Sequence, residues 1–504
     1  MSETSIEPRP WTSEPATTPD LEQQVEHARD AHLMLDPRPL EESNQQAIAS
    51  MQRTSRLTWA VVVVLLGGVG MAAASWLIQI ATGIGVTGLN NTIFWGIYIV
   101  NLVYFIGIGH AGTFISAAFR VLKFETRRPI ARAAETVTLF ALAAAALFPF
   151  IHLGRMWKAY WMIPYPNQRQ LWPNPQSALL WDATAILTYV IGSILFIYLS
   201  LIPDLAMLRE RTTGWRRVLY RALALGWRGT DREWSIQESA ANIFAYAIIP
   251  VMFSVHTIVS WDFAMTIQPG WHSTIFGPFF IVGALFSGVA AVIMVMAVLQ
   301  RFMKLAYFIR AEHFDAMAKF LLVMSFAWIY FYFAEVLTNW YGNLPPEMEI
   351  LDLLMHGAAA PFWFLMLFCN IVVPVGLLWM RRVRRSPGVL FVIAIFVQIG
   401  MYLERYIIVG VMLGRPEMPF RWSSYTPALE LIIAVGAFAF VASFYLDLHP
   451  RLPHHPALGG RRGAVVQWAA QGGPGVHERQ VRPALGPAPG RELRYGRIPG
   501  TRAF

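Results

Sequence analysis

Ten long apolar stretches constrain the fold of this chain more than any other feature of its sequence. They cover residues 57–81, 94–119, 133–154, 176–202, 236–262, 274–300, 319–341, 350–380, 388–412 and 425–447. Each is roughly 20 residues or longer, so as an α-helix it can cross the ~30 Å hydrocarbon layer of a bilayer. Charged residues make up only 14% of the chain, against about 25% in ordinary water-soluble domains. The sequence therefore predicts an all-α polytopic membrane protein with ten transmembrane helices.

The basic residues of the connecting loops predict the orientation of these helices. One set of alternate loops and helix flanks holds 22 Lys and Arg, and the opposite set holds five. Short cytoplasmic loops are enriched in Lys and Arg, so the richer set is placed in the cytoplasm. We expect a multi-pass membrane protein with both termini cytoplasmic. The net charge of +9 comes from basic residues in these short loops and in the tail. Their position is that of a membrane protein, so membrane lipid is the expected partner and nucleic acid is not.

The two ends of the chain differ from the part between them. Residues 1–55 are polar and acidic without an apolar run, and we expect a cytoplasmic extension there. The first apolar run begins near residue 57 and is too long for a secretory signal peptide. Residues 451–504 are rich in Gly, Pro and Arg and are expected to be a disordered tail. The membrane domain is expected to span residues 56–450.

Cysteine and histidine usage limits the cofactors that this chain can hold. Cys369 is the only cysteine, so thiolates cannot ligate an iron–sulfur cluster or attach a c-type haem. No apolar stretch carries two well-separated histidines, as a two-haem cytochrome b requires. We therefore expect no metal in this chain. If it takes part in redox chemistry, iron–sulfur and haem centres belong to partner subunits.

Seven ionisable residues lie inside or at the rim of the apolar stretches, and the helix count places all of them towards the outer side of the membrane. A charge in hydrocarbon is costly unless it is paired or lines a polar cavity, so these residues predict a site that handles protons or a substrate. They are His152, Asp182, His256, Asp262, Glu335, Glu404 and Arg405.

Two pairs of these residues have the chemistry of proton acceptors. His152 ends the third apolar stretch and Asp182 opens the fourth, so a short outer loop brings them to one level. A carboxylate beside an imidazole can relay the proton that a hydroxyl loses on oxidation. His256 and Asp262 share the fifth stretch, six residues or about 9 Å apart along a helix. The alternative is structural: each Asp caps a helix end and His152 packs in an interface.

Glu404 and Arg405 are neighbours in the ninth stretch and point about 100° apart on a helix. They cannot form a simple i,i+4 pair, so we expect Arg405 to reach Asp182 or Asp262 on another helix. A structural ion pair between helices is the alternative.

Three more groups are candidates for a proton path. His110 lies in the inner half of the second stretch between glycines, while Glu335 and His356 lie in the outer halves of the seventh and eighth. A relay through them would need waters or hydroxyls between the two levels. Hydrogen-bonded core residues are the equal alternative.

The chain resembles the NrfD/polysulfide-reductase-C family of quinone-interacting membrane subunits, and within it most closely the ActC subunit of alternative complex III. The matching motifs are residues 109–117, 148–155, 181–182, 255–263 and 404–406, within a resemblance that covers 57–447. The resemblance implies two four-helix bundles, helices two to five and six to nine, with the first and tenth helices peripheral. It also implies that His152, Asp182, His256, Asp262 and Arg405 surround a quinol head group near the periplasmic face, with Glu404, Arg155 and Trp181 as further contacts.

The function that this resemblance implies is quinol oxidation in a respiratory or photosynthetic electron-transfer complex of the bacterial inner membrane. Menaquinol or ubiquinol would give its electrons to a periplasmic iron–sulfur subunit, beside a second NrfD-like membrane subunit and multihaem cytochrome c subunits, with proton translocation as a possible further activity. Two alternatives are a quinone-reducing subunit of a molybdopterin oxidoreductase and a proton channel or transporter without redox chemistry. The first would use the same site, so the sequence does not set the direction of electron flow.

Overall fold

The computed structural model describes residues 56–90, 93, 95–124, 127–162, 176–266, 270–302, 306, 309–414 and 427–448. Within these ranges the chain is helical and contains no strand. Nine of the described helices are long and apolar enough to cross a membrane, and a shorter apolar helix, α17, brings the number to ten. The predicted all-α polytopic fold is confirmed. The segments 1–55 and 451–504, for which we predicted an extension and a tail, lie outside the described residues.

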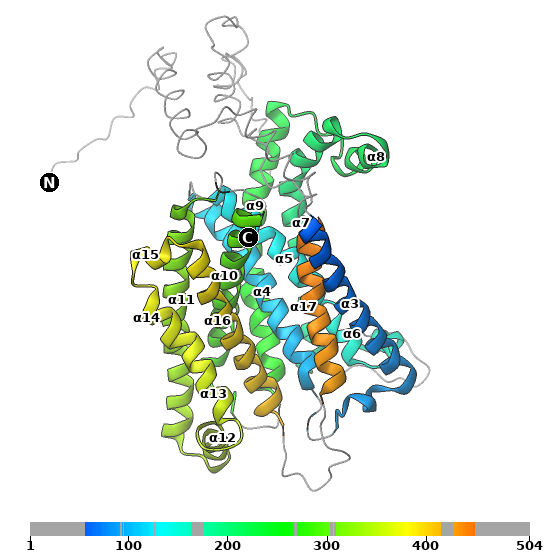
Figure 1. The fold of residues 1–504 in the computed structure, drawn as a ribbon. Coiled ribbons are helices and arrows are strands. Elements are labelled where there is room, and N and C mark those ends of the chain that lie inside the picture. Colours follow the sequence, from blue (N-terminus) through cyan, green and yellow to red (C-terminus); the bar gives the residue numbers. More distant parts are fainter. Residues whose placement is uncertain are drawn as a thin grey trace, which may run out of the picture.

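The first four-helix bundle is built around α4 (Gly96–Val121), the most completely buried of its helices (Figure 1). Its other members are α5 (Arg127–Ala145), which the short α6 (Phe148–His152) continues, α7 (Ala178–Arg211) and α9 (Asp231–Ala264). A Cβ atom on Gly112 would lie 2.5 Å from the carbonyl oxygen of Ala134 on α5. Glycine is therefore required where α4 and α5 touch.

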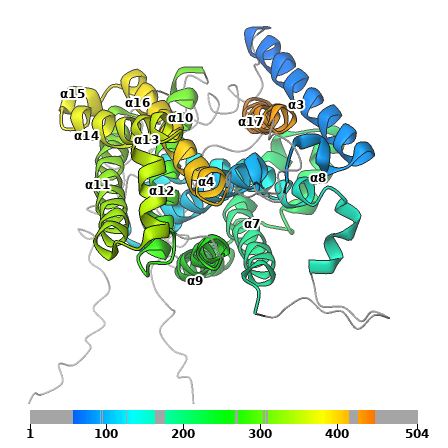
Figure 2. The same ribbon diagram turned by 90° about the horizontal axis from the view of Figure 1, so that it is seen from below.

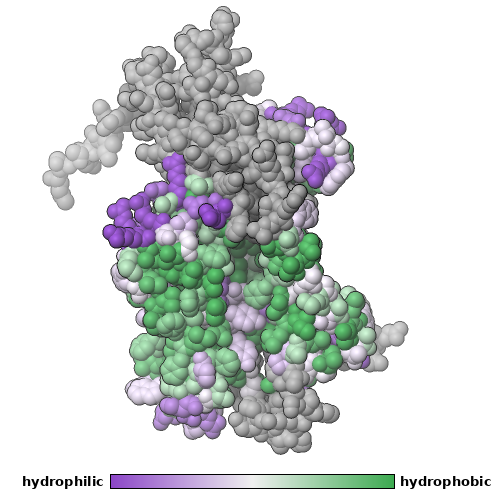
Figure 3. Space-filling view, viewed as in Figure 1, coloured by the Kyte–Doolittle hydropathy of each residue, from purple (hydrophilic) through white to green (hydrophobic). Residues whose placement is uncertain are grey.

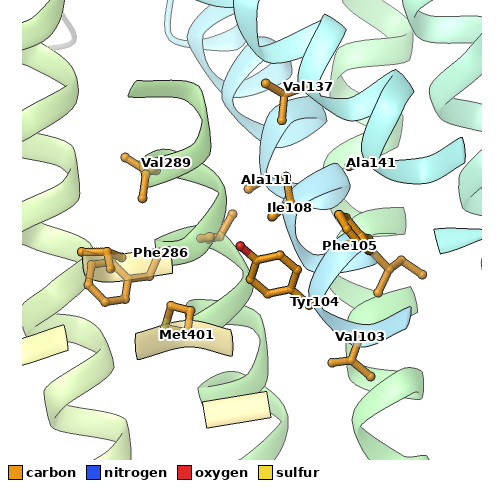
Figure 4. Close-up of a cluster of buried hydrophobic side chains, with 14 of the residues drawn as sticks. Val103, Tyr104, Phe105, Ile108, Ala111, Val137, Ala141, Phe286, Val289 and Met401 are labelled. Atoms are coloured by element: carbon orange, nitrogen blue, oxygen red, sulfur yellow. The ribbon is translucent and has the colours of Figure 1, made fainter. Parts of the chain in front are cut away.

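The second bundle consists of α10 (Phe276–Phe302), α11 (Ala311–Gly342), the chain of short helices from α13 to α14, and α16 (Pro387–Tyr406). α13 (Ala360–Leu367) and α14 (Val373–Leu377) are joined by the π-helical turn η3 (Phe368–Val372), and a second π turn, η4 (Ile407–Val411), follows α16. The bundles meet where α4 packs against α10. Apolar side chains from both bundles fill this region, including Tyr104, Ile108, Phe286 and Met401 (Figure 4).

Two helices, α3 (Arg56–Thr82) and α17 (Ala428–Leu448), pack against each other beside the bundles (Figure 2). A Cβ atom on Gly436 would lie 2.1 Å from that of Ala72, so the pair depends on small residues for its close approach. Hydrophobic side chains cover α3, α17 and α11 as a band, while hydrophilic ones gather over α15 (Arg381–Arg384) and α12 (Pro345–Met355) at opposite ends (Figure 3). This is the distribution expected of a protein that spans a bilayer.

Helices α7 and α9 are 34 residues long each, about 51 Å at 1.5 Å per residue, and so exceed the hydrocarbon thickness. They project from one end of the bundle, where α8 (Gly214–Leu223) packs against α7 and lies to one side (Figure 1). A capping box starts α9: Thr230 N donates to Glu233 Oε2 at 2.9 Å, and Glu233 N donates to Thr230 Oγ1 at 3.3 Å. We call this end of the molecule the α8 end and the opposite one the α6 end.

Two predicted helices are interrupted, which corrects our interpretation of the third and eighth stretches. The third stretch breaks at Ala146 and Leu147 before restarting as α6. The eighth begins with α12, turns after Met355, and becomes membrane-spanning only from Ala360. Both restarts carry a proline in the first helical turn, Pro149 and Pro361. Proline has no N–H to continue a preceding helix but fits the first turn of a new one.

Candidate functional site

Two Trp-Asp pairs face each other at the α6 end of the first bundle. The rings of Trp181 on α7 and Trp261 on α9 are in edge contact, with centroids 6.1 Å apart. The neighbouring carboxyl groups, Asp182 and Asp262, are each 8% exposed and interact through their side chains. One oxygen of each, Oδ1, is buried without a hydrogen-bond partner among the described residues. Asp182 lies one turn inside α7, so it is not the residue that caps this helix.

Histidines continue the site towards the middle of the first bundle. His256 lies on α9 six residues before Asp262, about 9 Å further in. Its ring contacts that of His110 on α4, with centroids 4.8 Å apart, and the ring of Tyr189 stacks on His110 at 3.8 Å. Both histidines are fully buried. Neither ring nitrogen of His256 has a hydrogen-bond partner among the described residues, so one nitrogen can donate its N–H to a substrate and the other can accept a proton.

His110 is oriented by its own helix. Its Nδ1 lies 2.7 Å from the carbonyl oxygen of Ile106, one turn earlier. A proton on Nδ1 is shared with that carbonyl, so Nε2 is left as the acceptor. Gly107 faces the second histidine, because a Cβ atom there would lie 3.9 Å from the His256 ring and 3.4 Å from Ala284.

Arg405 has a different partner from the one predicted. Its Nη1 lies 3.2 Å from Glu404 Oε2, and its guanidinium lies over the ring of Phe280, with Cζ 4.3 Å from the centroid. The expectation that Arg405 reaches Asp182 or Asp262 is therefore wrong. A Cβ atom on Gly283 would lie 2.7 Å from Arg405 Nη2, so α10 leaves space that directs the guanidinium towards it.

Phe280 connects the Arg405 group to the first bundle, because its ring also contacts His256, with centroids 4.9 Å apart. Glu404 is held on its other side by Trp328, whose Nε1 donates to Glu404 Oε1 at 2.9 Å. The groups from His110 to Glu404 therefore form one array across the interface between the bundles.

His152 ends α6 and lies at the same end of α4 as the Asp pair. The ring of Phe148 on α6 stacks on Phe105 of α4, with centroids 6.2 Å apart. On α4, Trp95 contacts Phe263, the residue after Asp262, at 5.2 Å. His152 Nδ1 is buried without a hydrogen-bond partner among the described residues. Arg155 follows α6 with its side chain exposed.

The three proton-path candidates occupy separate places. His110 belongs to the first bundle, whereas Glu335 lies on α11 in the second, 1% exposed and hydrogen-bonded to Ser273. His356 is not in a membrane-spanning helix: it follows α12, with its side chain 75% exposed and Nδ1 2.9 Å from Asp352. The structure brings His110 to His256 but does not bring the three together.

Sequence reasoning missed a buried polar cluster at the α8 end of the first bundle. Arg132 binds Glu135 at 2.9 Å and Asp204 at 2.5 Å, and Ser116 donates to Glu135 at 2.8 Å. All four are at most 9% exposed. The loop-charge count treated Arg132 only as a cytoplasmic flank residue. The signal that could have found the cluster was a carboxylate, Glu135, inside an apolar stretch.

Hydroxyl groups also line the space between this cluster and His110. Tyr189 Oη donates to Thr113 Oγ1 at 2.9 Å, and Thr113 Oγ1 lies 3.4 Å from the hydroxyls of both Thr138 and Ser193. Ser and Thr give no recognisable sequence signal of a polar site in an apolar helix, because their hydroxyls can also bond to carbonyl groups of their own helix.

The described residues contain no group of three or more His, Cys, Asp or Glu side chains that could hold a metal ion. Cys369 is buried in η3. The site thus offers carboxyl and imidazole groups as proton acceptors and aromatic rings as a packing surface.

Comparison with known proteins supplies the family. The model of the "Polysulphide reductase, NrfD" family matches residues 85–413. The chain is 25% identical over 348 residues to a protein of Halobacterium salinarum named as a membrane subunit of dimethyl sulfoxide reductase, covering 69% of this chain and 75% of that protein. It is 24% identical to the menaquinone reductase integral membrane subunit of Nitratidesulfovibrio vulgaris, over 78% of this chain and 92% of that one.

A third relative matches a smaller part. This protein, a selenate reductase subunit of Mesobacillus selenatarsenatis, is 26% identical over 223 residues, 43% of this chain and 51% of its own length. The chain therefore matches about half the length of this relative. The matched family region contains every candidate site residue from His110 to Arg405.

Proposed function

The chain belongs to the polysulphide reductase NrfD family, and from this premise we propose that it oxidises a quinol at the α6 end of its first bundle. Membership makes it an integral membrane subunit of an oxidoreductase complex. One observation carries the proposal: the carboxyl groups of Asp182 and Asp262 meet, buried, at a bundle end, with the unpartnered ring of His256 further in. Menaquinol or ubiquinol is the substrate.

The side chains match what the reaction releases. Oxidation of a quinol gives two electrons and two protons, and each hydroxyl needs a base within hydrogen-bonding reach. We assign His152, Asp182, His256 and Asp262 as proton acceptors. Arg405, with Glu404, Arg155 and Trp181, is assigned to binding of the head group. The relative that is named for menaquinone supports a quinone substrate.

The electrons must leave the chain, and we assign their acceptor to partner subunits. An iron–sulfur subunit on the α6 end would receive them and pass them to multihaem cytochrome c subunits, beside a second NrfD-like membrane subunit. This arrangement is that of alternative complex III.

A second candidate is reduction of quinone with electrons from a molybdopterin subunit. The relatives named as dimethyl sulfoxide and selenate reductase subunits favour it. It would use the same residues in the reverse direction. A transporter is disfavoured because the Asp pair and His152 lie at one end of the bundle, whereas transporters bind near the midplane at broken helices.

An assay on the whole complex tests the direction. The complex is placed in lipid vesicles, a quinol is added, and reduction of the haem partners is followed by absorbance. Haem reduction by quinol supports the proposal. Haems that stay oxidised, while a reduced partner converts quinone to quinol, would favour the second candidate.

We propose that the α8 end faces the cytoplasm and the α6 end the periplasm, in accord with the loop charges. Two exposed positions at opposite ends allow a test: Tyr341, 83% exposed at the end of α11, and Arg382 in α15. In a Cys369→Ser background, Tyr341→Cys should react in intact cells with a thiol reagent that does not cross membranes. Arg382→Cys should react only after the membrane is opened. The reverse pattern would contradict the orientation.

We also propose that the first bundle conducts protons from the α8-end cluster, through the hydroxyls beside Tyr189, to His110 and His256. Glu335 remains a candidate for a separate path in the second bundle. In vesicles that oxidise quinol, His110→Ala or Glu335→Gln should lower the number of protons released per electron while electron transfer continues. Glu349→Gln, which changes an exposed carboxyl group in α12, serves as the control. If both variants keep the wild-type ratio, these residues are structural.

A further inference from the structure

Helix α3 is mostly exposed, yet one of its polar side chains is completely buried against the site. Val64 and Leu77 are 74% and 65% exposed, whereas Gln79 is 0% exposed. Gln79 Nε2 donates to the carbonyl oxygen of Ile151 at 2.6 Å, and Gln79 Oε1 accepts from the Tyr98 hydroxyl at 2.6 Å. Burying a side-chain amide costs little free energy only when both its NH2 group and its oxygen form hydrogen bonds. Gln79 therefore bridges α6 and α4.

The carbonyl that Gln79 binds belongs to the residue before His152. α6 has only five residues, and Pro149 within it has no N–H to donate. Within this turn, Ile151 N donates to Leu147 O and Leu153 N to Pro149 O, both at 3.0 Å, and Gly154 N donates to Ile151 O at 3.2 Å. The Ile151 carbonyl thus has one partner within the turn and a second, closer one, Gln79, on another helix, which ties the turn that carries His152 to α3.

The segment after α3 supports the same turn. Gly154 has φ +66°, and a Cβ atom there would lie 3.1 Å from the Ile84 side chain in η1 (Ile84–Thr87). Glycine is favoured at this position both by its left-handed conformation and by the close approach of η1. The chain from Gln79 to Ile84 therefore packs along the turn that carries His152.

Helix α17 provides a matching contact at the end of α4. Glu430 Oε2 accepts from Ile97 N in the first turn of α4 at 2.9 Å. A carboxylate is favourable there because it satisfies a free N–H and faces the positive end of the helix dipole. Tyr98, the partner of Gln79, is the next residue. Since α3 and α17 pack on each other, together they hold α6 and the end of α4.

We propose that Gln79 is a positioning residue for His152: through the Ile151 carbonyl, it sets the direction in which the imidazole faces the substrate. The catalytic role of His152 in this inference rests on the proposed function. The contact between Gln79 and the Ile151 carbonyl does not. Gln79 and Glu430 both lie outside residues 85–413, the part of the chain matched by the family model. The peripheral helices thus add support to a site built from the family region.

Three variants of the full chain, in its complex, test the role. Gln79→Met keeps the length of the side chain but removes both hydrogen bonds. Gln79→Glu keeps the acceptor for Tyr98 and can donate to Ile151 only when protonated. The control is Gln300→Met, because Gln300 Nε2 also donates to a backbone carbonyl, that of Ile309 at 2.7 Å, away from the site.

Two readouts are measured: the pH profile of kcat for quinol oxidation, and the rate at which diethyl pyrocarbonate modifies His152, followed by peptide mass spectrometry. Gln79→Met should lower kcat by about tenfold or more, since a small displacement of a reacting group can cost up to about 10². It should also change the modification rate of His152 several-fold. Gln79→Glu should approach wild-type kcat as the pH falls, and Gln300→Met should match wild type.

The modification readout separates this proposal from the proposed function. If the complex does not oxidise quinol but His152 reactivity still changes in Gln79→Met, the positioning role stands and the function fails. If kcat falls while His152 reactivity and the pH profile stay at wild type, Gln79 only attaches α3 and the proposal is overturned. The same conclusion follows if Gln79→Glu shows no recovery at low pH.

Discussion

Replacing His152 or Asp182 by alanine is expected to reduce quinol oxidation by about 10² or more, the usual scale for the loss of an acid–base group. His152 presents a buried imidazole nitrogen without a partner among the described residues, and the buried Asp182 carboxyl group lies beside that of Asp262. Each change removes a proton acceptor at the α6 end while leaving the apolar packing of the bundle in place. The complex should therefore assemble normally, and kcat is the quantity to measure.

Two exposed residues at the α6 end, one with a carboxyl group and one with an imidazole, serve as matched controls. Asp352 lies in α12 with its side chain 75% exposed, and His272 is exposed in the segment that follows α9. Asp352→Ala and His272→Ala should retain wild-type turnover. Wild-type turnover in an assembled His152→Ala complex would show that His152 is not part of the site.

Replacing Arg405 by leucine is expected to destabilise the protein by about 3–5 kcal/mol, the range for breaking a buried ion pair. Arg405 and Glu404 are 2% and 1% exposed, so the change would leave the Glu404 carboxylate buried beside only the Trp328 N–H. Thermal unfolding in detergent measures the loss. The double variant Glu404→Gln/Arg405→Met should recover most of the stability, because it leaves no buried charge.

The control is a pair of the same chemistry at the surface. Arg385 Nη2 lies 2.8 Å from Glu312 Oε1, with side chains 37% and 59% exposed. Arg385→Leu should cost at most about 1 kcal/mol, as exposed pairs do. Equal stability of Arg405→Leu and Arg385→Leu would contradict the buried-pair account. Quinol oxidation should stay low in the double variant, because the cation beside Phe280 and His256 is still missing.

The partner of Arg405 could not be predicted from the sequence. Periodicity placed Glu404 and Arg405 about 100° apart, and from that we expected Arg405 to find a carboxylate on α7 or α9. The deciding feature is Gly283 on α10, whose missing side chain leaves room for the guanidinium over Phe280. Which residue stands opposite a glycine on another helix depends on how the helices are rotated and crossed, and no local pattern records this.

The third and eighth stretches show a second limit. Their apolar length predicted uninterrupted helices, although Pro149 and Pro361 were visible in the sequence. Apolar composition continues through both breaks, so hydropathy alone cannot locate them. The break before α6 has consequences for the site, because the turn that carries His152 is tied to Gln79 on another helix.

The sequence by itself determined that this chain is an all-α membrane protein with ten apolar helices, and which ionisable residues lie within them. It could do so because each helix satisfies its own backbone hydrogen bonds in a bilayer, so apolar length is sufficient evidence. Only the tertiary structure decided which polar groups meet: Asp182 with Asp262, His110 with His256, and Gln79 with the carbonyl before His152. These contacts join residues distant in the chain, and they follow from the side-chain packing that fixes each helix's rotation and depth.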